Sequence, residues 1–113
     1  MLTISMPRGD IRTVSFTVKD ETKADVILDE IFFTVKESYN KGPYLFQKRL
    51  STGEIERLED GNFQFMIRPE DTNGLKFKEY VFDIEVLAGN DIKQTFVGSL
   101  QLTSEVTHAE NER

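Results

Sequence analysis

An alternation of apolar and polar side chains runs through most of this chain, and it constrains the fold more than any other feature. Successive side chains of a β-strand point to opposite faces, so a period of two predicts strands with one buried and one wet face. The pattern predicts inward-facing sets in five segments: Val14, Phe16 and Val18; Ile31, Phe33 and Val35; Phe63, Phe65 and Ile67; Tyr80, Phe82, Ile84 and Val86; and Ile92, Phe96, Leu100 and Leu102.

Turn-forming residues separate the strands, and two weaker strands are expected at residues 44–50 and 55–58. The turns are Gly42-Pro43, Thr52-Gly53, Asp60-Gly61, Asn73-Gly74 and Gly89-Asn90. Pro69 suits the first position of a helix, so one short helical turn is expected near residues 69–72. Short strands at a spacing of about ten residues predict an all-β, antiparallel sandwich or barrel of about seven strands.

The last hairpin allows its register to be predicted. If the inward set of residues 80–86 pairs with that of the final strand, the numbers of paired residues must add to an even value. A two-residue loop at Gly89-Asn90 would break this parity, so we expect a three-residue loop, Gly89-Asn90-Asp91, or a compensating bulge. In that register Ile84 faces Phe96, and Phe82 lies opposite Gly98.

Composition limits the chemistry that the chain can perform. Its 113 residues predict one domain over residues 1–103 and a polar, flexible C-terminal tail at 104–113. The net charge of -6 disfavours nucleic acid and anionic membranes as partners. Cysteine is absent, and His108 is the only histidine. No motif indicates catalytic, cofactor-binding or metal-binding residues, so we expect no enzyme activity, no cofactor and no small-molecule substrate.

Apolar side chains on the outward parity of the strands are the best candidates for a functional surface. Phe32 is the clearest, because it is a large ring on the outward side of a strand whose inward side already carries Ile31, Phe33 and Val35. Such residues either form a patch that another protein chain covers or are isolated on an ordinary surface. The candidate protein interface comprises Phe32, Tyr44, Phe46, Val81, Leu87 and Val97. The segment 44–50 has the composition of an edge strand that a partner could extend.

The order of several short segments resembles that of small immunoglobulin-like domains of tailed bacteriophages and prophages. The most specific segments are the Phe-Thr-Val-Lys of residues 33–36, the Pro-Glu-Asp-Thr of 69–72 and the Tyr-Val-Phe-Asp-Ile-Glu-Val of 80–86. The chain is similar in particular to the N-terminal domain of baseplate upper proteins, over residues 9–107. The resemblance implies an immunoglobulin-like β-sandwich, and by analogy Tyr80 is expected to form a tyrosine corner with nearby backbone.

The resemblance also implies a function. It predicts a structural protein that contacts other tail or baseplate proteins, or further copies of itself, during virion assembly. Such a protein would be synthesised in the bacterial cytoplasm and would then reside in the virion. The alternative is a stand-alone binding module at a bacterial surface, which would recognise carbohydrate or protein through loops at one end of the sandwich. Tyr39 and Tyr44 would then be the residues expected to stack on sugars.

Overall fold

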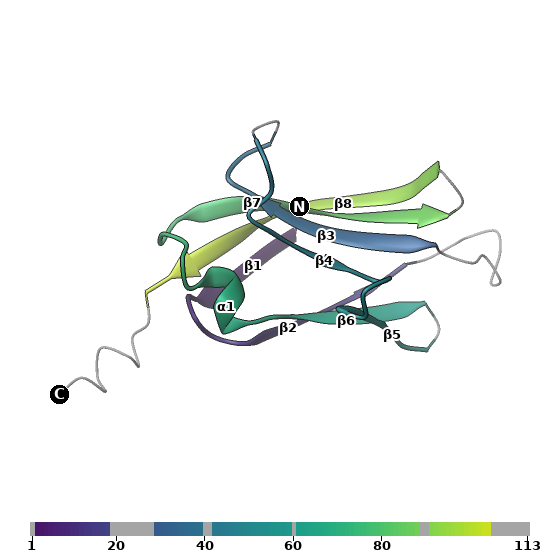
Figure 1. The fold of residues 1–113 in the computed structure, drawn as a ribbon, viewed down its shortest axis with the longest axis horizontal. Helices are drawn as coiled ribbons and strands as arrows, with labels where there is room; N and C mark the ends of the chain where they lie inside the picture. The colour runs from purple at the N-terminus through teal and green to yellow at the C-terminus, as the bar shows by residue number, and fades with distance from the viewer. Residues whose placement is uncertain (1, 19–28, 40–41, 60, 89–90, 105–113) are drawn as a thin grey trace.

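A computed structural model describes residues 2–18, 29–39, 42–59, 61–88 and 91–104, which form two β-sheets packed face to face (Figure 1). The tail expected at 104–113 lies outside the described residues except for Ser104, and Gly89 and Asn90 lie outside them as well. The larger sheet has the order β1-β8-β7-β3-β4, and the smaller has the order β2-β6-β5.

Eight strands and one helical turn make up the described part of the chain. The elements are β1 (Leu2–Pro7), β2 (Arg12–Thr17), β3 (Glu30–Lys36), β4 (Phe46–Arg49), β5 (Ile55–Arg57), β6 (Asn62–Ile67), α1 (Pro69–Thr72), β7 (Glu79–Ala88) and β8 (Asp91–Thr103).

The strand order confirms the predicted immunoglobulin-like sandwich. The neighbours β4-β3-β7-β8 correspond to strands C′-C-F-G of an immunoglobulin domain, and β5-β6-β2 correspond to D-E-B. Tyr80 lies at the start of β7, and its hydroxyl donates a hydrogen bond of 2.9 Å to the carbonyl oxygen of Lys76. The expected tyrosine corner is therefore present, and it fixes the connection that leads from α1 into β7.

The first strand differs from the sequence-based prediction. Residues 2–7 form an additional strand, β1, which pairs in parallel with β8, so the larger sheet is mixed and not purely antiparallel. Ile4 and Met6 point into the core, where they are 7% and 2% exposed. The same period of two is present in this segment, but its partner lies at the opposite end of the sequence.

The hydrophobic core lies between the sheets and contains most of the inward sets predicted from the alternation. Phe96 is only partly buried, and the side chain of Ile92 lies outside the described part of the structure. The buried apolar side chains are Ile4, Met6, Ile31, Phe33, Val35, Phe46, Ile55, Phe63, Phe65, Ile67, Tyr80, Phe82, Ile84, Val86, Leu100 and Leu102. Val14, Phe16 and Val18 also face inward, but they are only partly buried. In the smaller sheet, the inward side chains of β6 are therefore fully covered, whereas those of β2 are only partly covered.

The register of the last hairpin is confirmed through the bulge. Ile84 pairs with Phe96 and Phe82 with Gly98, and the register shifts between Val86 and Leu87. The pair Ala88 and Asp91 then leaves only two residues for the connection. A Cβ atom at position 98 would lie 2.6 Å from Cζ of Phe82, so glycine is required for the ring to pack there.

Candidate interaction surface

The outward side chains of β3, β7 and β8 lie on the outer side of the five-stranded sheet. We call this surface the five-strand face. It carries four of the six predicted interface residues: Phe32, Val81, Leu87 and Val97. Val97 is 45% exposed, whereas the other three are half-buried. The pairing of β3 with β7 thus brings these four side chains to the same side of the sheet, and each of them points outward, as predicted.

Charged residues alternate with these apolar side chains. Phe32 lies between Arg49 on β4 and Glu85 on β7, and Val97 lies opposite Asp83. The guanidinium carbon of Arg49 stands 5.0 Å from the centroid of the Phe32 ring, in the geometry of a cation–π contact. The five-strand face is therefore a mixed surface with aromatic and charged groups side by side.

Two carboxylates on this sheet have environments that change their acidity. Burial raises the pKa of the Asp83 carboxyl, and the positive charge of Lys36 opposes that rise. Burial would also raise the pKa of Glu30, but hydrogen bonds from Ser51 and Ile31, together with the charge of Arg49, leave that pKa below its ordinary value. Asp83 is thus a partly desolvated charge near the middle of the sheet.

The two remaining interface candidates do not join the five-strand face. Phe46 is 9% exposed and belongs to the core, where its ring centroid lies 6.1 Å from that of Phe33. Its assignment to an interface is wrong, because the inward parity of β4 carries Phe46 and Lys48. Tyr44 precedes β4 and is 50% exposed, and Tyr39 is 45% exposed. The Tyr39 hydroxyl donates to the carbonyl oxygen of Gly98 at 3.4 Å.

The segment 44–50 was expected to supply an edge strand, and β4 does lie at an edge of the larger sheet. Leu50 donates its amide to Ile31, so residues 47 and 49 direct their backbone groups away from β3. The amide of Arg49 donates to the Glu54 carboxylate at 3.2 Å, and the Thr52 hydroxyl donates to the Arg49 carbonyl at 3.1 Å. The following turn therefore occupies this end of the β4 edge.

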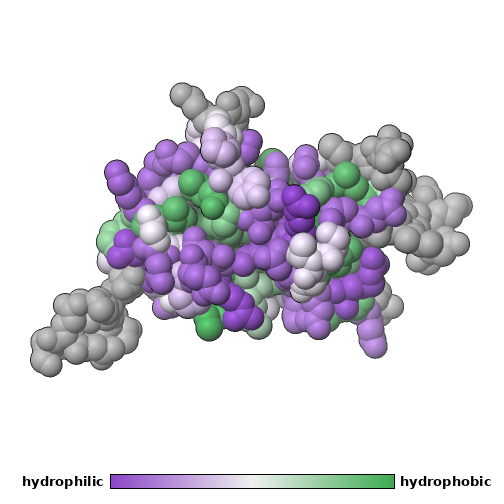
Figure 2. Space-filling model, in the orientation of Figure 1, coloured by the Kyte–Doolittle hydropathy of each residue, from purple (hydrophilic) through white to green (hydrophobic). Residues whose placement is uncertain are grey.

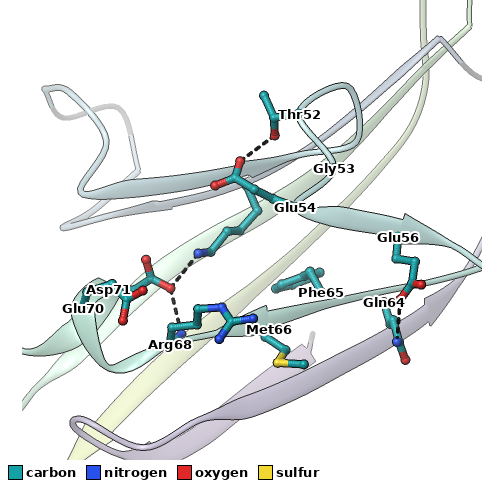
Figure 3. A pocket seen from close by; sticks show the side chains of 11 residues that line it. Thr52, Gly53, Glu54, Glu56, Gln64, Phe65, Met66, Arg68, Glu70 and Asp71 are labelled. Atoms are coloured by element: carbon teal, nitrogen blue, oxygen red, sulfur yellow. Dashed lines mark hydrogen bonds and ion pairs between the residues drawn. The ribbon is translucent and has the colours of Figure 1, made fainter.

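A hollow of about 660 Å³ lies between β4, β5, β6 and α1 (Figure 3). On its wall, Nζ of Lys48 donates to Oδ2 of Asp71 at 2.7 Å, and the two side chains are 9% and 12% exposed. The same oxygen accepts the backbone amide of Arg68 at 2.8 Å, which caps α1. This ion pair attaches the helical turn to the edge strand of the opposite sheet.

Other polar groups around the hollow are engaged in local contacts. Glu54 accepts from the Thr52 hydroxyl at 2.7 Å, and Glu56 accepts from the Gln64 amide at 2.8 Å (Figure 3). In the described ranges, no group of three or more acidic or histidine side chains is placed to hold a metal ion. The hollow is thus lined by polar groups, several of which are paired with one another, and by apolar side chains such as Phe65.

Sequence reasoning missed the buried Lys48–Asp71 pair, because a lysine in an alternating strand indicates a solvated position. The signal that could have found it is the parity itself, since Lys48 shares the face of Phe46. Of the described helices, none is both long and apolar enough to cross a bilayer. Comparison of the chain with models of protein families and with curated proteins gave no match.

Proposed function

We propose that this chain is a non-enzymatic structural protein of a bacteriophage or prophage. In this proposal it is a β-sandwich module that mediates protein–protein contacts in the tail or baseplate. It is synthesised in the bacterial cytoplasm and becomes part of the virion on assembly. Its partners are other tail or baseplate proteins, and the sequence resemblance over residues 9–107 motivates this assignment.

The observation that carries the proposal is the arrangement of Phe32 on the five-strand face. Aromatic and arginine side chains are enriched in protein interfaces and often contribute most of the binding energy. Here the Arg49 guanidinium stands over the Phe32 ring, with Val97 exposed two strands away. A partner that covers this face would bury the ring and the flat side of the guanidinium together, and it would pair with the carboxylates between them.

The direct test is the protein content of purified particles. Virions produced by the host that encodes the chain are purified on a density gradient, and their proteins are quantified by mass spectrometry. We expect the chain at a fixed stoichiometric ratio to known tail proteins. Its absence from particles that contain all other tail proteins would contradict the virion role.

A substitution on the five-strand face tests the mechanism. Phe32→Glu should reduce incorporation into particles at least tenfold, because a carboxylate would replace the ring beside Glu85. The matched control is Met66→Glu, which places the same charge at a 38% exposed apolar position on the other sheet. Both variants should keep the wild-type far-ultraviolet dichroism. Equal incorporation of both variants would remove the five-strand face from the proposal.

The alternative function, a surface module that binds carbohydrate, draws on the exposed rings of Tyr39 and Tyr44. A glycan array distinguishes the two functions. Under the proposal, the wild-type protein gives no saturable glycan signal. Saturable binding that is lost in Tyr39→Ala would overturn the proposal in favour of the alternative.

A further inference from the structure

Strand β2 forms an edge of the smaller sheet, and among the described residues no strand lies beside one side of its backbone. The amide of Val18 donates to the carbonyl oxygen of Gly61 at 2.9 Å, at the end of the β2–β6 ladder. Hydrogen-bonded pairs alternate along such a ladder, so the even-numbered residues of β2 bond to β6. Thr13, Ser15 and Thr17 therefore direct their amides and carbonyls to the open side, and we call these three residues the β2 edge.

The other sheet edges carry features that obstruct strand addition. At β4, Glu54 and Thr52 occupy the backbone of Arg49. At β1, the Arg12 guanidinium donates to the Ser5 carbonyl at 2.9 Å. Strand β5 has only three residues, two of which are charged. Within the described ranges, the backbone groups of the β2 edge have no comparable cover, although natural sheets normally protect an edge of this length.

Charged residues are also rare on β2 and on its described neighbour β6. Thr13, Ser15 and Thr17 are all exposed, and their neighbours on β6 in the same face are Met66, Gln64 and Asn62. Charged residues make up 30% of the chain, yet only Arg12 is charged within β2 and β6 together. An edge without charges lacks the usual electrostatic barrier to pairing with another strand.

The inner side of β2 is incompletely covered. Val14 and Phe16 face the core but stay half-buried, while Phe63 and Phe65 on the adjacent strand are 1% and 2% exposed. Phe16 packs against Phe63 with ring centroids 5.6 Å apart. A strand added beside β2 would cover the remaining apolar surface of Phe16 as well as satisfy the free backbone groups.

We propose that the β2 edge pairs antiparallel with the β2 edge of a second copy of this chain. The register is centred on Ser15, so that Ser15 meets Ser15 of the other copy, and Thr13 meets Thr17. Each of these pairs exchanges both of its backbone hydrogen bonds. The two small sheets join into one continuous sheet with the order β5-β6-β2-β2-β6-β5, related by a twofold axis.

The sequence of β2 fits a copy of itself in this register. On the inner face, Val14 meets Phe16 of the other copy, which is an apolar pair of the kind that stabilises adjacent strands. On the outer face, hydroxyl side chains meet hydroxyl side chains. Arg12 meets Val18, so no like charges are opposed although each chain has a net charge of -6. This pairing leaves the five-strand face free and does not depend on a virion role.

A charge at the twofold axis provides the test. Ser15→Lys places two ammonium groups directly opposite each other in the dimer. Sedimentation velocity over a concentration series should therefore show a dimer for the wild type and dimerisation at least tenfold weaker for this variant. The matched control is Gln64→Lys, which adds the same charge to the same outer face, directly across from Ser15 but one strand away from the edge. The control should dimerise like the wild type.

Rescue by the opposite charge excludes misfolding as the cause. Ser15→Glu alone should also be monomeric, whereas an equimolar mixture of Ser15→Lys and Ser15→Glu should recover dimer. Hydrogen exchange gives a second readout, because the amides of Thr13, Ser15 and Thr17 should be protected only in the dimer. The amides of Val14 and Phe16 should be protected in both states. A wild type that stays monomeric throughout, or a dimer in which the three edge amides exchange freely, would overturn the proposal.

Discussion

The two lateral sides of the sandwich close the core in different ways. On the side of β4 and α1, a lysine from one sheet and an aspartate from the helical turn meet across the gap and seal it. Figure 2 shows this side as a largely hydrophilic surface with scattered apolar residues. On the side of β2, Val14 and Phe16 remain half-buried and an uncharged strand edge is exposed. The comparison teaches that one side of a sandwich core can be covered by an ion pair within the chain, while the other side stays partly exposed and could be covered by a second chain.

The largest expected effect is on stability, and it should differ between a buried and a half-buried aromatic residue of the smaller sheet. Phe65→Ala should lower the free energy of unfolding by about 3–5 kcal/mol, because the ring is 2% exposed and lies 4.3 Å from the Phe33 ring between centroids. Phe16→Ala should cost about half as much, since less of its ring is covered. Urea denaturation at low protein concentration measures both costs. Equal costs would show that the β2 side is as well sealed as the β6 strand.

The second largest effect on stability concerns the side of β4 and α1. Lys48→Met should cost about 2 kcal/mol, because it leaves the Asp71 carboxylate with little solvent and without its cation. The double variant Lys48→Met with Asp71→Asn should recover most of that loss, since the asparagine oxygen can still accept the Arg68 amide. A double-mutant cycle from urea denaturation measures the coupling. Strictly additive costs would mean that the pair does not hold α1 to β4.

The smallest effect tests the five-strand face. Burial raises the folded-state pKa of Asp83, so the folded chain binds the proton more tightly and loses stability as the pH rises through that pKa. Asp83→Asn should therefore raise the Tm at neutral pH by about 2 °C, after allowance for solvent screening, and this gain should disappear in acid. Glu85→Gln on the same face controls for the loss of charge. A gain that is independent of pH would exclude desolvation of Asp83 as its cause.

Much of the fold could be predicted because one face of each strand is buried. The parity argument predicted the pairing of Ile84 with Phe96, and it required either a longer loop or the bulge that the structure contains. The parallel pairing of β1 could not be predicted in the same way. No short turn connects β1 to β8, so nothing local in the sequence specifies its partner.

The candidate site was predictable only in part. Alternation predicted that Phe32, Val81 and Leu87 point outward, because outward parity is a local property, and the hairpin register added Val97. That all four share one face depends on the pairing of β3 with β7, which was not predicted. The edge-like composition of residues 44–50 was misleading for Phe46, since the face of β4 that carries Phe46 and Lys48 is buried, and Asp71 neutralises Lys48 from another part of the chain. The open edge of β2 was equally hidden, because an edge is defined by the absence of a neighbouring strand.

The pairing of β1 with β8 has a consequence for synthesis on the ribosome. Leu2 pairs with Gly98, so β1 is synthesised long before the strand with which it pairs. Contacts between such distant parts of a chain form slowly and leave unpaired strands exposed meanwhile. Until β8 is synthesised, β1 and β7 both expose the backbone groups that β8 later pairs with. A chaperone that shields extended segments would have most to protect at this stage.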